Sequence, residues 1–393
     1  MFLQAKTSKF ILIVGLLVGL FGSLKFLYVD NKSFLNGELS RGQIVGRDFL
    51  HSWTAIQLAS VGKFNDIYNP DLLVSHAPSK VKDSGVAFNF VYPPQTLAFL
   101  LPLAKLDYIA ALAIWSLFGL ILYALCIKLV TTSKLAFCLL LAPTTFLNLS
   151  MGQNGLVTGT LLVLGLCLIE RYPKVAGILI GILTIKPHLG ILIPIALIVG
   201  KYKETFTWAV ISSISLFAIS TFAFGMDVWR AWIDNTPWIY AKNFIEHGTG
   251  IALFMQPSPF MSIRLWFDNL SLAWGAQIIS AIIAILSVIY AFRKSDNFQL
   301  KISVIITATY LVSPYIHSYD MAALSLVIIW QLQNGINNGF IYGEQILLVI
   351  LWLMPLTMTA LGFLGWPIFP ILTLMLLFLL ILKLDRPNHV IDL

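Results

Sequence analysis

Long apolar runs separated by polar segments dominate this chain of 393 residues. A helix needs about 20 apolar residues to cross a hydrocarbon core of about 30 Å. Backbone groups in lipid must be hydrogen-bonded within the spanning structure, and these runs lack the alternating pattern of barrel strands, so they predict helices. The runs long enough to span are 10–29, 108–130, 206–224, 272–292, 346–364 and 366–382.

Two further segments are apolar but do not read as single spans. Residues 96–105 are too few to cross a membrane, so we expect a re-entrant or interfacial segment. Residues 176–200 are interrupted by Lys186-Pro187-His188, which predicts a hairpin of two half helices with this tripeptide at its bend. The sequence therefore predicts an all-α polytopic membrane protein with about 10–13 transmembrane or half-membrane helices. No repeat or low-complexity linker divides it, so residues 1–393 form a single predicted domain.

Composition agrees with this class. Hydrophobic residues make up 58% of the chain and charged residues only 11%, whereas about a quarter of an ordinary soluble domain is charged. The three cysteines lie in apolar runs and read as core residues rather than a disulfide or metal framework. The net charge of +7 is dispersed over short loops, so nucleic-acid binding is not expected. The first apolar run contains Lys25 and no small-residue cleavage motif follows, which favours a retained helix over a signal peptide.

Charge in the short loops predicts which side each loop faces. Basic short loops stay in the cytoplasm, and here all of them can do so together with the N-terminus. The loops left on the outside are 30–94, 150–155, 186–188, 225–262, 313–320 and 365–367. These hold nearly all the polar clusters capable of chemistry. We therefore expect a multi-pass protein of the plasma or inner membrane whose site faces the extracytoplasmic side. The main polar loop would be 30–94, and 225–262 a second outer loop.

Several short motifs occur in order along the chain, most of them in these outer segments. They are Gly46-Arg47-Asp48-Phe49, Tyr68-Asn69-Pro70, Tyr92-Pro93-Pro94, Gly152-Gln153-Asn154-Gly155, Gly177 with Gly181, Lys186-Pro187, and Ser313-Pro314 with His317 and Tyr319. Taken together, this pattern resembles glycosyltransferase family 87. The resemblance implies a C-type membrane glycosyltransferase fold and a polyprenyl-phosphate-linked sugar, mannose in the best-known members. It also implies transfer with inversion, by direct displacement at the anomeric carbon.

The site residues follow from this chemistry. An acceptor hydroxyl needs a base within hydrogen-bond reach, and Asp48 is the predicted general base. A phosphate leaving group gains negative charge, which cations in a water-poor pocket stabilise. Lys186 is the first candidate for this role because its setting is apolar, where an unpaired ammonium is costly. The predicted phosphate-binding residues are Lys186, His188, His317 and Arg47. The predicted sugar- or acceptor-binding residues are Tyr92, Gln153, Asn154, Tyr319 and Asp320.

Each of these residues also has an ordinary structural explanation. Asp48 could pair with Arg47 or cap the helix that follows, and Asn154 could be a cap as well. Lys186 could extend its ammonium to the membrane interface. Arg47 could be a solvated loop cation, the histidines could be structural, and Asp320 could form a surface pair with His317. The aromatic residues of the second outer loop would most simply form an interfacial belt; they are Trp229, Trp232, Trp238 and Tyr240.

The predicted partners are a polyprenyl-phosphate-linked sugar, membrane lipid, and a glycolipid or other envelope acceptor. No cofactor or metal is expected, since the chain has no glycine-rich phosphate loop, zinc-ligand spacing or Asp-x-Asp pair. A polytopic transporter or lipid flippase is the main alternative function. It would place ionisable residues near the membrane midplane between related halves, and no internal repeat is visible. A structural partner in envelope assembly is a third interpretation, and only the enzyme requires the Asp48 carboxylate chemically.

Overall fold

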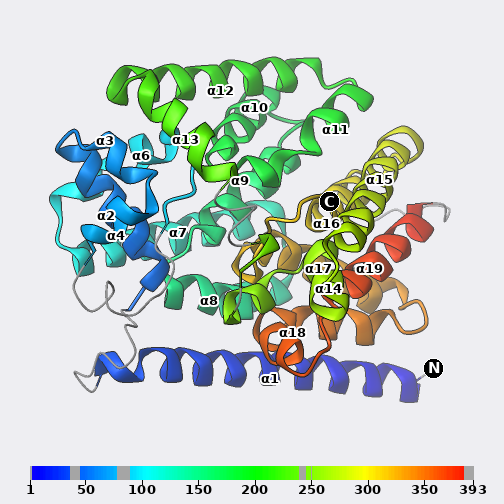
Figure 1. Cartoon of the computed structure of the whole chain (residues 1–393). Coiled ribbons are helices and arrows are strands. Elements are labelled where there is room, and N and C mark those ends of the chain that lie inside the picture. Colours follow the sequence, from blue (N-terminus) through cyan, green and yellow to red (C-terminus); the bar gives the residue numbers. More distant parts are fainter. Residues whose placement is uncertain (1, 36–44, 78–88, 239–244, 249, 385–393) are drawn as a thin grey trace.

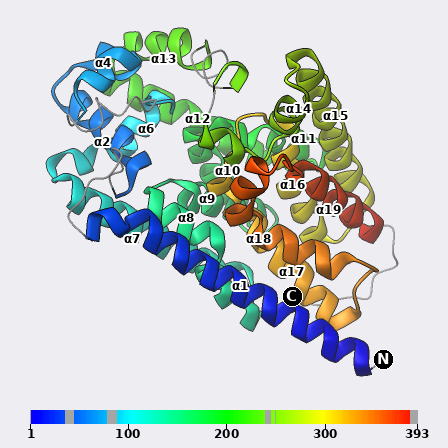
Figure 2. The same ribbon diagram turned by 60° about the horizontal axis from the view of Figure 1, so that its bottom comes forward.

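A computed structural model describes residues 2–35, 45–77, 89–238, 245–248 and 250–384. Every regular element within these residues is helical, which confirms the all-α prediction. Figure 1 shows two long helices, α1 and α12, along opposite edges of the molecule, with the other helices between them. In Figure 2 α1 crosses the outside of the bundle, where it packs on α8 and α18.

Six helical segments are long and apolar enough to cross a membrane. They are Ile11–Val29 within α1 (Phe2–Leu35), α7 (Tyr108–Val130), Lys134–Met151 (η3 and α8), α12 (Lys203–Phe224), α15 (Leu270–Lys294) and α18 (Glu344–Phe363). Five of them coincide with predicted runs. The segment Lys134–Met151 was not predicted because Thr144, Thr145 and Asn148 interrupt its hydropathy; all three are buried by protein rather than exposed. The predicted run 366–382 forms the shorter α19 (Phe369–Leu384), since a turn precedes it.

Five shorter apolar segments lie beside these spans: α9 (Gly155–Cys167), Pro173–Ile185, Pro187–Val199, α16 (Phe298–Val312) and α19. The buried helix α17 (Ala322–Asn338) packs among them. The predicted hairpin with a break is present. It consists of α10 (Pro173–Ile182) and α11 (Ile193–Val199), joined by 3-10 turns on either side of Lys186. The predicted short segment 96–105 is α6 (Pro94–Leu100) followed by η2 (Leu101–Lys105).

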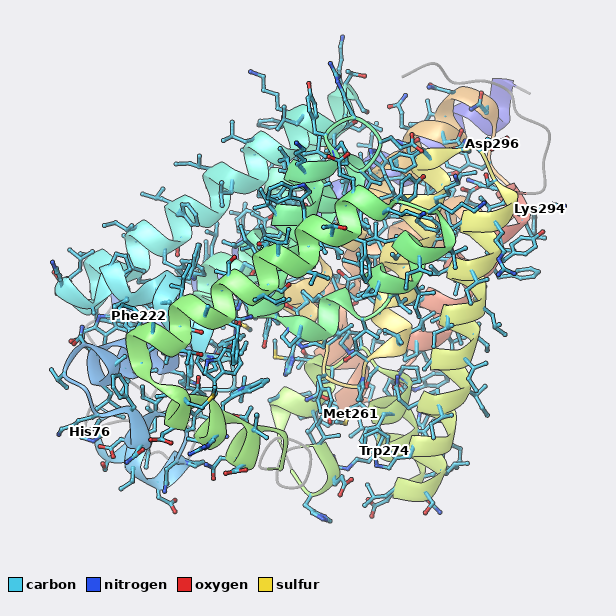
Figure 3. The ribbon with its side chains drawn as sticks, turned by 90° about the horizontal axis from the view of Figure 1, so that it is seen from above. His76, Phe222, Met261, Trp274, Lys294 and Asp296 are labelled. Atoms are coloured by element: carbon cyan, nitrogen blue, oxygen red, sulfur yellow. The ribbon has the colours of Figure 1, made fainter. Side chains whose placement is uncertain are left out.

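The glycines of the 177–181 motif bring two helices together. A Cβ at Gly177 would lie 2.5 Å from the carbonyl oxygen of Thr205, and one at Gly181 would lie 2.4 Å from Cβ of Ser212. Only glycine fits at such distances, so α10 and α12 pack backbone to backbone, as small residues allow in membranes. The outer face of α12 stays apolar and uncovered: Phe222, labelled on α12 in Figure 3, is 96% exposed. Such a surface suits contact with lipid.

The two ends of the bundle carry different elements. In Figure 1 α2 (Arg47–Ser60), α3 (Phe64–Ile67), α4 (Pro70–Ser75) and α13 (Met226–Trp238) gather at one end, and the N-terminus of α1 lies at the other. Figure 3 likewise places His76 and Trp274 at one end and, at the other, Lys294, the last residue of α15, and Asp296, which follows it. Which end faces the cytoplasm stays a prediction.

The helix α1 continues to Leu35, six residues past the apolar span that ends at Val29. One detail of the predicted outer loops needs correction. The aromatic belt prediction is wrong for Trp229 and Trp232. Trp229 is buried with its ring 4.7 Å from that of Phe217, and Trp232 Nε1 donates a hydrogen bond to the carbonyl of Val91 (3.2 Å). Trp229 therefore packs α13 against α12, and Trp232 bonds α13 to the 89–92 segment. The side chain of Trp238 and all of Tyr240 lie outside the described residues.

Candidate active site

The start of α2 places Asp48. Gly46 is the N-cap residue of α2 and has a φ of 65°, in the left-handed region. Its N–H donates a hydrogen bond to the carbonyl of Ser150 (3.2 Å). On the other side of this contact a Cβ at Gly152 would lie 2.6 Å from Cβ of Phe49. The first turn of α2 is therefore packed against the turn between α8 (Pro143–Met151) and α9. The capping alternative for Asp48 is wrong, since Gly46 occupies the N-cap and no side chain caps the helix.

The Asp48 carboxylate contacts this neighbouring turn. Gln153 Nε2 donates a hydrogen bond to Asp48 Oδ2 (2.8 Å), and Tyr92 OH donates one to Gln153 Oε1 (3.1 Å). Tyr92 is itself fixed at its backbone, because its carbonyl accepts from Tyr68 OH (2.9 Å). Three predicted site residues from three distant segments thus form one hydrogen-bonded chain.

A second chain of contacts is centred on Lys186. The residue before a proline avoids helical geometry, and Lys186 lies where the helix breaks before Pro187. Its Nζ donates to Asn154 Oδ1 (3.1 Å) and pairs with the buried carboxylate of Asp320. Lys186 is only 3% exposed and Asp320 1%. The snorkelling alternative for Lys186 and the surface-pair alternative for Asp320 are therefore wrong. Asn154 occupies the N-cap of α9, but its side chain binds Lys186 rather than capping the helix.

Aromatic rings surround the Lys186 ammonium. Its Nζ lies 4.9 Å from the ring centroid of Tyr319 and 5.8 Å from that of Tyr92. The His317 ring stacks on Tyr319 with centroids 5.0 Å apart. Asp320 Oδ2 also accepts the backbone N–H of His317 (3.2 Å), so one carboxylate orients both the lysine and the histidine segment. Cation–π contacts of this kind stabilise a charge that has little water around it.

Burial determines the charge of His317, which lies outside the membrane-spanning segments. Burial lowers the pKa of His317 to about 4, although Asp320 and Asp48 nearby favour its protonation. The ring is therefore neutral at pH 7 and can accept or donate one hydrogen bond at each nitrogen. His188 lies within electrostatic range of Lys186, Asp320 and His317. Its Nε2 is buried without a hydrogen-bond partner among the described residues.

Two polar residues that sequence reasoning missed also belong to the site. His51 lies one helical turn after Asp48, with Nδ1 3.1 Å from the carbonyl oxygen of Asn89. Burial lowers the pKa of His51, and the Asp48 charge opposes that shift. Asn148 Nδ2 donates to the carbonyl of Tyr319 (2.8 Å). The i, i+3 spacing of Asp48 and His51 was a readable signal; nothing local in the sequence pointed to Asn148.

A narrow pocket opens beside Asp48. Its polar lining is Asp48, Ser52, Tyr92, Thr96, Gln153 and Asn154, together with Gly152, and its apolar lining is Phe49, Phe99, Leu100, Trp115 and Ile185. The space between atoms is about 360 Å³, including the open mouth. Phe99 is 39% exposed, and its ring packs on Trp115 with centroids 6.3 Å apart. The apolar wall thus continues from the carboxylate to the outer surface of α6 and α7.

The predicted site residues divide by how directly the structure connects them. Eight of them are joined by hydrogen bonds, cation–π contacts or ring stacking: Asp48, Tyr92, Gln153, Asn154, Lys186, Asp320, Tyr319 and His317. His188 is close enough to this group to interact electrostatically with Lys186, Asp320 and His317. Arg47 precedes Asp48 as the first residue of α2. Over the described ranges no group of three or more His, Cys, Asp or Glu side chains could hold a metal ion. The expectation that no metal takes part stays a prediction.

The chain matches a known protein family. The model of glycosyltransferase family 87 matches residues 90–314, which is more than half of the chain. Tyr92, Gln153, Asn154, Lys186 and His188 lie inside the matched region, whereas Asp48 and the 317–320 segment lie outside it. Comparison with curated proteins and with solved structures gives no match. The match favours an enzyme over the transporter or flippase alternative. The chain belongs to glycosyltransferase family 87.

Proposed function

We propose that this glycosyltransferase moves a hexose, with mannose as the predicted sugar, from a polyprenyl-phosphate carrier to an acceptor on the extracytoplasmic side of the plasma or inner membrane. The observation that carries the proposal is the Asp48 carboxylate, which lies in a pocket and is linked through Gln153 and Asn154 to the buried Lys186. A glycolipid or another envelope molecule would be the acceptor. The residues of the 30–94 and 225–262 segments would form the catalytic end of one membrane domain.

Asp48 would act as the general base. The acceptor hydroxyl attacks the anomeric carbon while its proton passes to the Asp48 carboxylate. The bond between that carbon and the phosphate oxygen breaks, and polyprenyl phosphate leaves with the electron pair. The new glycosidic bond has the inverted configuration. Gln153 occupies Asp48 Oδ2 (2.8 Å), which leaves Oδ1 to receive the hydroxyl.

Lys186 would stabilise the leaving phosphate. Two hydrogen-bond donors of its ammonium are used by Asn154 and Asp320, and a third is available to a phosphate oxygen. Since water is nearly excluded here, the charge acts strongly on an anion that gains charge as the bond breaks. His188, His317 and Arg47 would add hydrogen bonds to the same phosphate. The buried, unpartnered Nε2 of His188 is one such group.

A lipid-linked sugar fits the two-sided lining of the pocket. The sugar would meet Tyr92 and Asn154 in the polar lining, where aromatic faces and amides match ring faces and hydroxyls, and Tyr319 and Asp320 would contact it from beyond that lining. The phosphate-proximal part of the lipid would lie toward the wall formed by Phe99 and Trp115. This arrangement explains why one pocket is both polar and open to apolar surface.

The test is sugar transfer from radiolabelled polyprenyl-phosphate sugars to a membrane extract by the purified chain. Asp48→Asn keeps the side-chain volume but cannot accept the proton, so the transfer rate should fall by about 10²- to 10⁴-fold. Binding of the lipid-linked sugar should persist. A matched control is Asp71→Asn, since Asp71 lies in the exposed turn that begins α4. A near wild-type rate for folded, membrane-inserted Asp48→Asn would refute the base assignment.

A further inference from the structure

The Gln153 side chain, predicted from the sequence to bind sugar, is committed to protein contacts instead. Its Oε1 lies 3.1 Å from Tyr92 OH and 3.4 Å from the backbone nitrogen of Asn154. A backbone N–H can only donate a hydrogen bond, so the atom facing it must be the acceptor oxygen of the amide. The other end of the amide, Nε2, is then directed at Asp48 Oδ2 (2.8 Å). The orientation of the amide is therefore determined by its surroundings.

This accounting leaves little of Gln153 for a ligand. Both lone pairs of Oε1 and one N–H of Nε2 are used within the protein, so a single N–H remains. Gln153 also follows Gly152, whose close approach to Phe49 fixes the distance between this turn and the first turn of α2. Gln153 and Asp48 thus belong to two turns that contact each other directly, and this contact fixes the distance between the two residues.

We propose that Gln153 is a positioning residue for Asp48, oriented by Tyr92 and the Asn154 backbone, rather than a sugar-recognition residue. This inference rests on the proposed function for its catalytic consequence. Gln153 directs one carboxylate oxygen away from the ligand and stabilises the ionised carboxylate by donating to it. Asp48 Oδ1 then faces the acceptor hydroxyl in a fixed orientation, and fixed geometry is worth a large part of the rate in such a step.

The kinetic test separates positioning from recognition. Gln153→Ala should lower kcat by about 10- to 100-fold, because the base loses its orientation, and leave the KM for the polyprenyl-phosphate sugar unchanged. The acidic limb of the pH–rate profile should move to higher pH, since the ionised carboxylate loses a hydrogen bond. Tyr92→Phe should reduce kcat only a few-fold, because the Asn154 N–H still orients the amide. Gln57→Ala is the matched control: Gln57 lies on the same α2, and its side-chain amide donates to the Ala104 carbonyl.

An infrared measurement tests the contact without requiring transfer. The difference spectrum between wild type and Asp48→Asn isolates the carboxylate band of Asp48, and this band should shift in frequency in Gln153→Ala because the carboxylate loses a hydrogen bond. An unmoved band would overturn the inference, as would a raised KM with unchanged kcat and pH limb. If Asp48→Asn transfers normally, the proposed function fails instead. The infrared shift then still decides whether Gln153 holds Asp48.

Discussion

Two buried lysine–carboxylate pairs occur at different places in this bundle. Lys186 pairs with Asp320 next to the pocket, and Lys383 pairs with Glu344 where α18 begins and α19 ends. The side chains of both pairs are at most 9% exposed. Lys383 also donates to Gln331 Oε1 (2.9 Å), and Glu344 accepts the Ile341 backbone N–H (2.9 Å). By burial and charge alone the pairs are equivalent.

Their neighbours differ. The Lys186 pair is surrounded by groups capable of chemistry: two aromatic rings, the amide of Asn154, and His188, whose Nε2 has no hydrogen-bond partner among the described residues. The Lys383 pair is enclosed by α17 (Ala322–Asn338), α18 and α19, and the described residues show only packing and hydrogen bonds around it. A buried ion pair in a membrane bundle is therefore not by itself a mark of a site. The groups around the pair make the difference.

The largest expected effect comes from breaking the Lys383 pair. Lys383→Met leaves the Glu344 carboxylate buried without its cation, so the free energy of unfolding should fall by about 3–5 kcal/mol. Urea or thermal unfolding in detergent would measure it. The transfer rate per folded molecule should not change. The double variant Lys383→Met with Glu344→Gln should recover most of the stability, because no uncompensated charge remains.

A surface pair provides the control for that prediction. Arg230 and Asp227 are bonded at 3.0 Å, but their side chains are 73% and 83% exposed. Arg230→Ala should leave the stability within measurement error, because water already screens the pair. A large loss there, or an unchanged stability in Lys383→Met, would contradict the packing role of the buried pair.

The Lys186 pair should respond to the same double substitution in a different way. Lys186→Met with Asp320→Asn removes both charges, so the protein should fold. Transfer should still fall by about 10²-fold or more, because the cation facing the leaving phosphate is gone, and binding of the polyprenyl-phosphate sugar should weaken. Transfer assays and lipid binding on the two double variants test the comparison directly. Equal activity in both would remove Lys186 from the mechanism.

A smaller effect than that of Lys383→Met or of the Lys186 double substitution is the loss of stability that His317 causes in acid. His317 has a pKa of about 4 in the folded chain, below the ordinary value of 6.5. Between these values the unfolded chain takes up the proton first, so stability falls as the pH drops from about 6.5 toward 4. The loss should be about 2 kcal/mol at pH 5. Thermal unfolding of wild type and His317→Gln at pH 7.5 and 5 checks it, since the variant should lose less. An equal loss in both would contradict it.

The sequence by itself determined the class, most of the spans and the membership of the candidate site. Apolar runs of spanning length force helices in lipid, and the break at Lys186-Pro187 follows from proline chemistry. The motif around Asp48, Gln153 and Lys186 was readable because residue type limits which chemistry is possible. The run 134–151 was missed because its polar residues, such as Asn148, are satisfied by neighbouring helices that a local window does not include.

Only the tertiary structure decided how the site residues are paired. Whether Lys186 is solvated or bound to Asp320, 134 residues away, depends on where α10 and α16 end relative to each other. Whether Gln153 faces a ligand or Asp48 depends on a close glycine contact between two turns. Hydrophobic periodicity fixes which face of a helix is buried, but hydrogen-bond partners across a bundle depend on the relative position and rotation of whole helices. That information is held in the packing of many side chains at once.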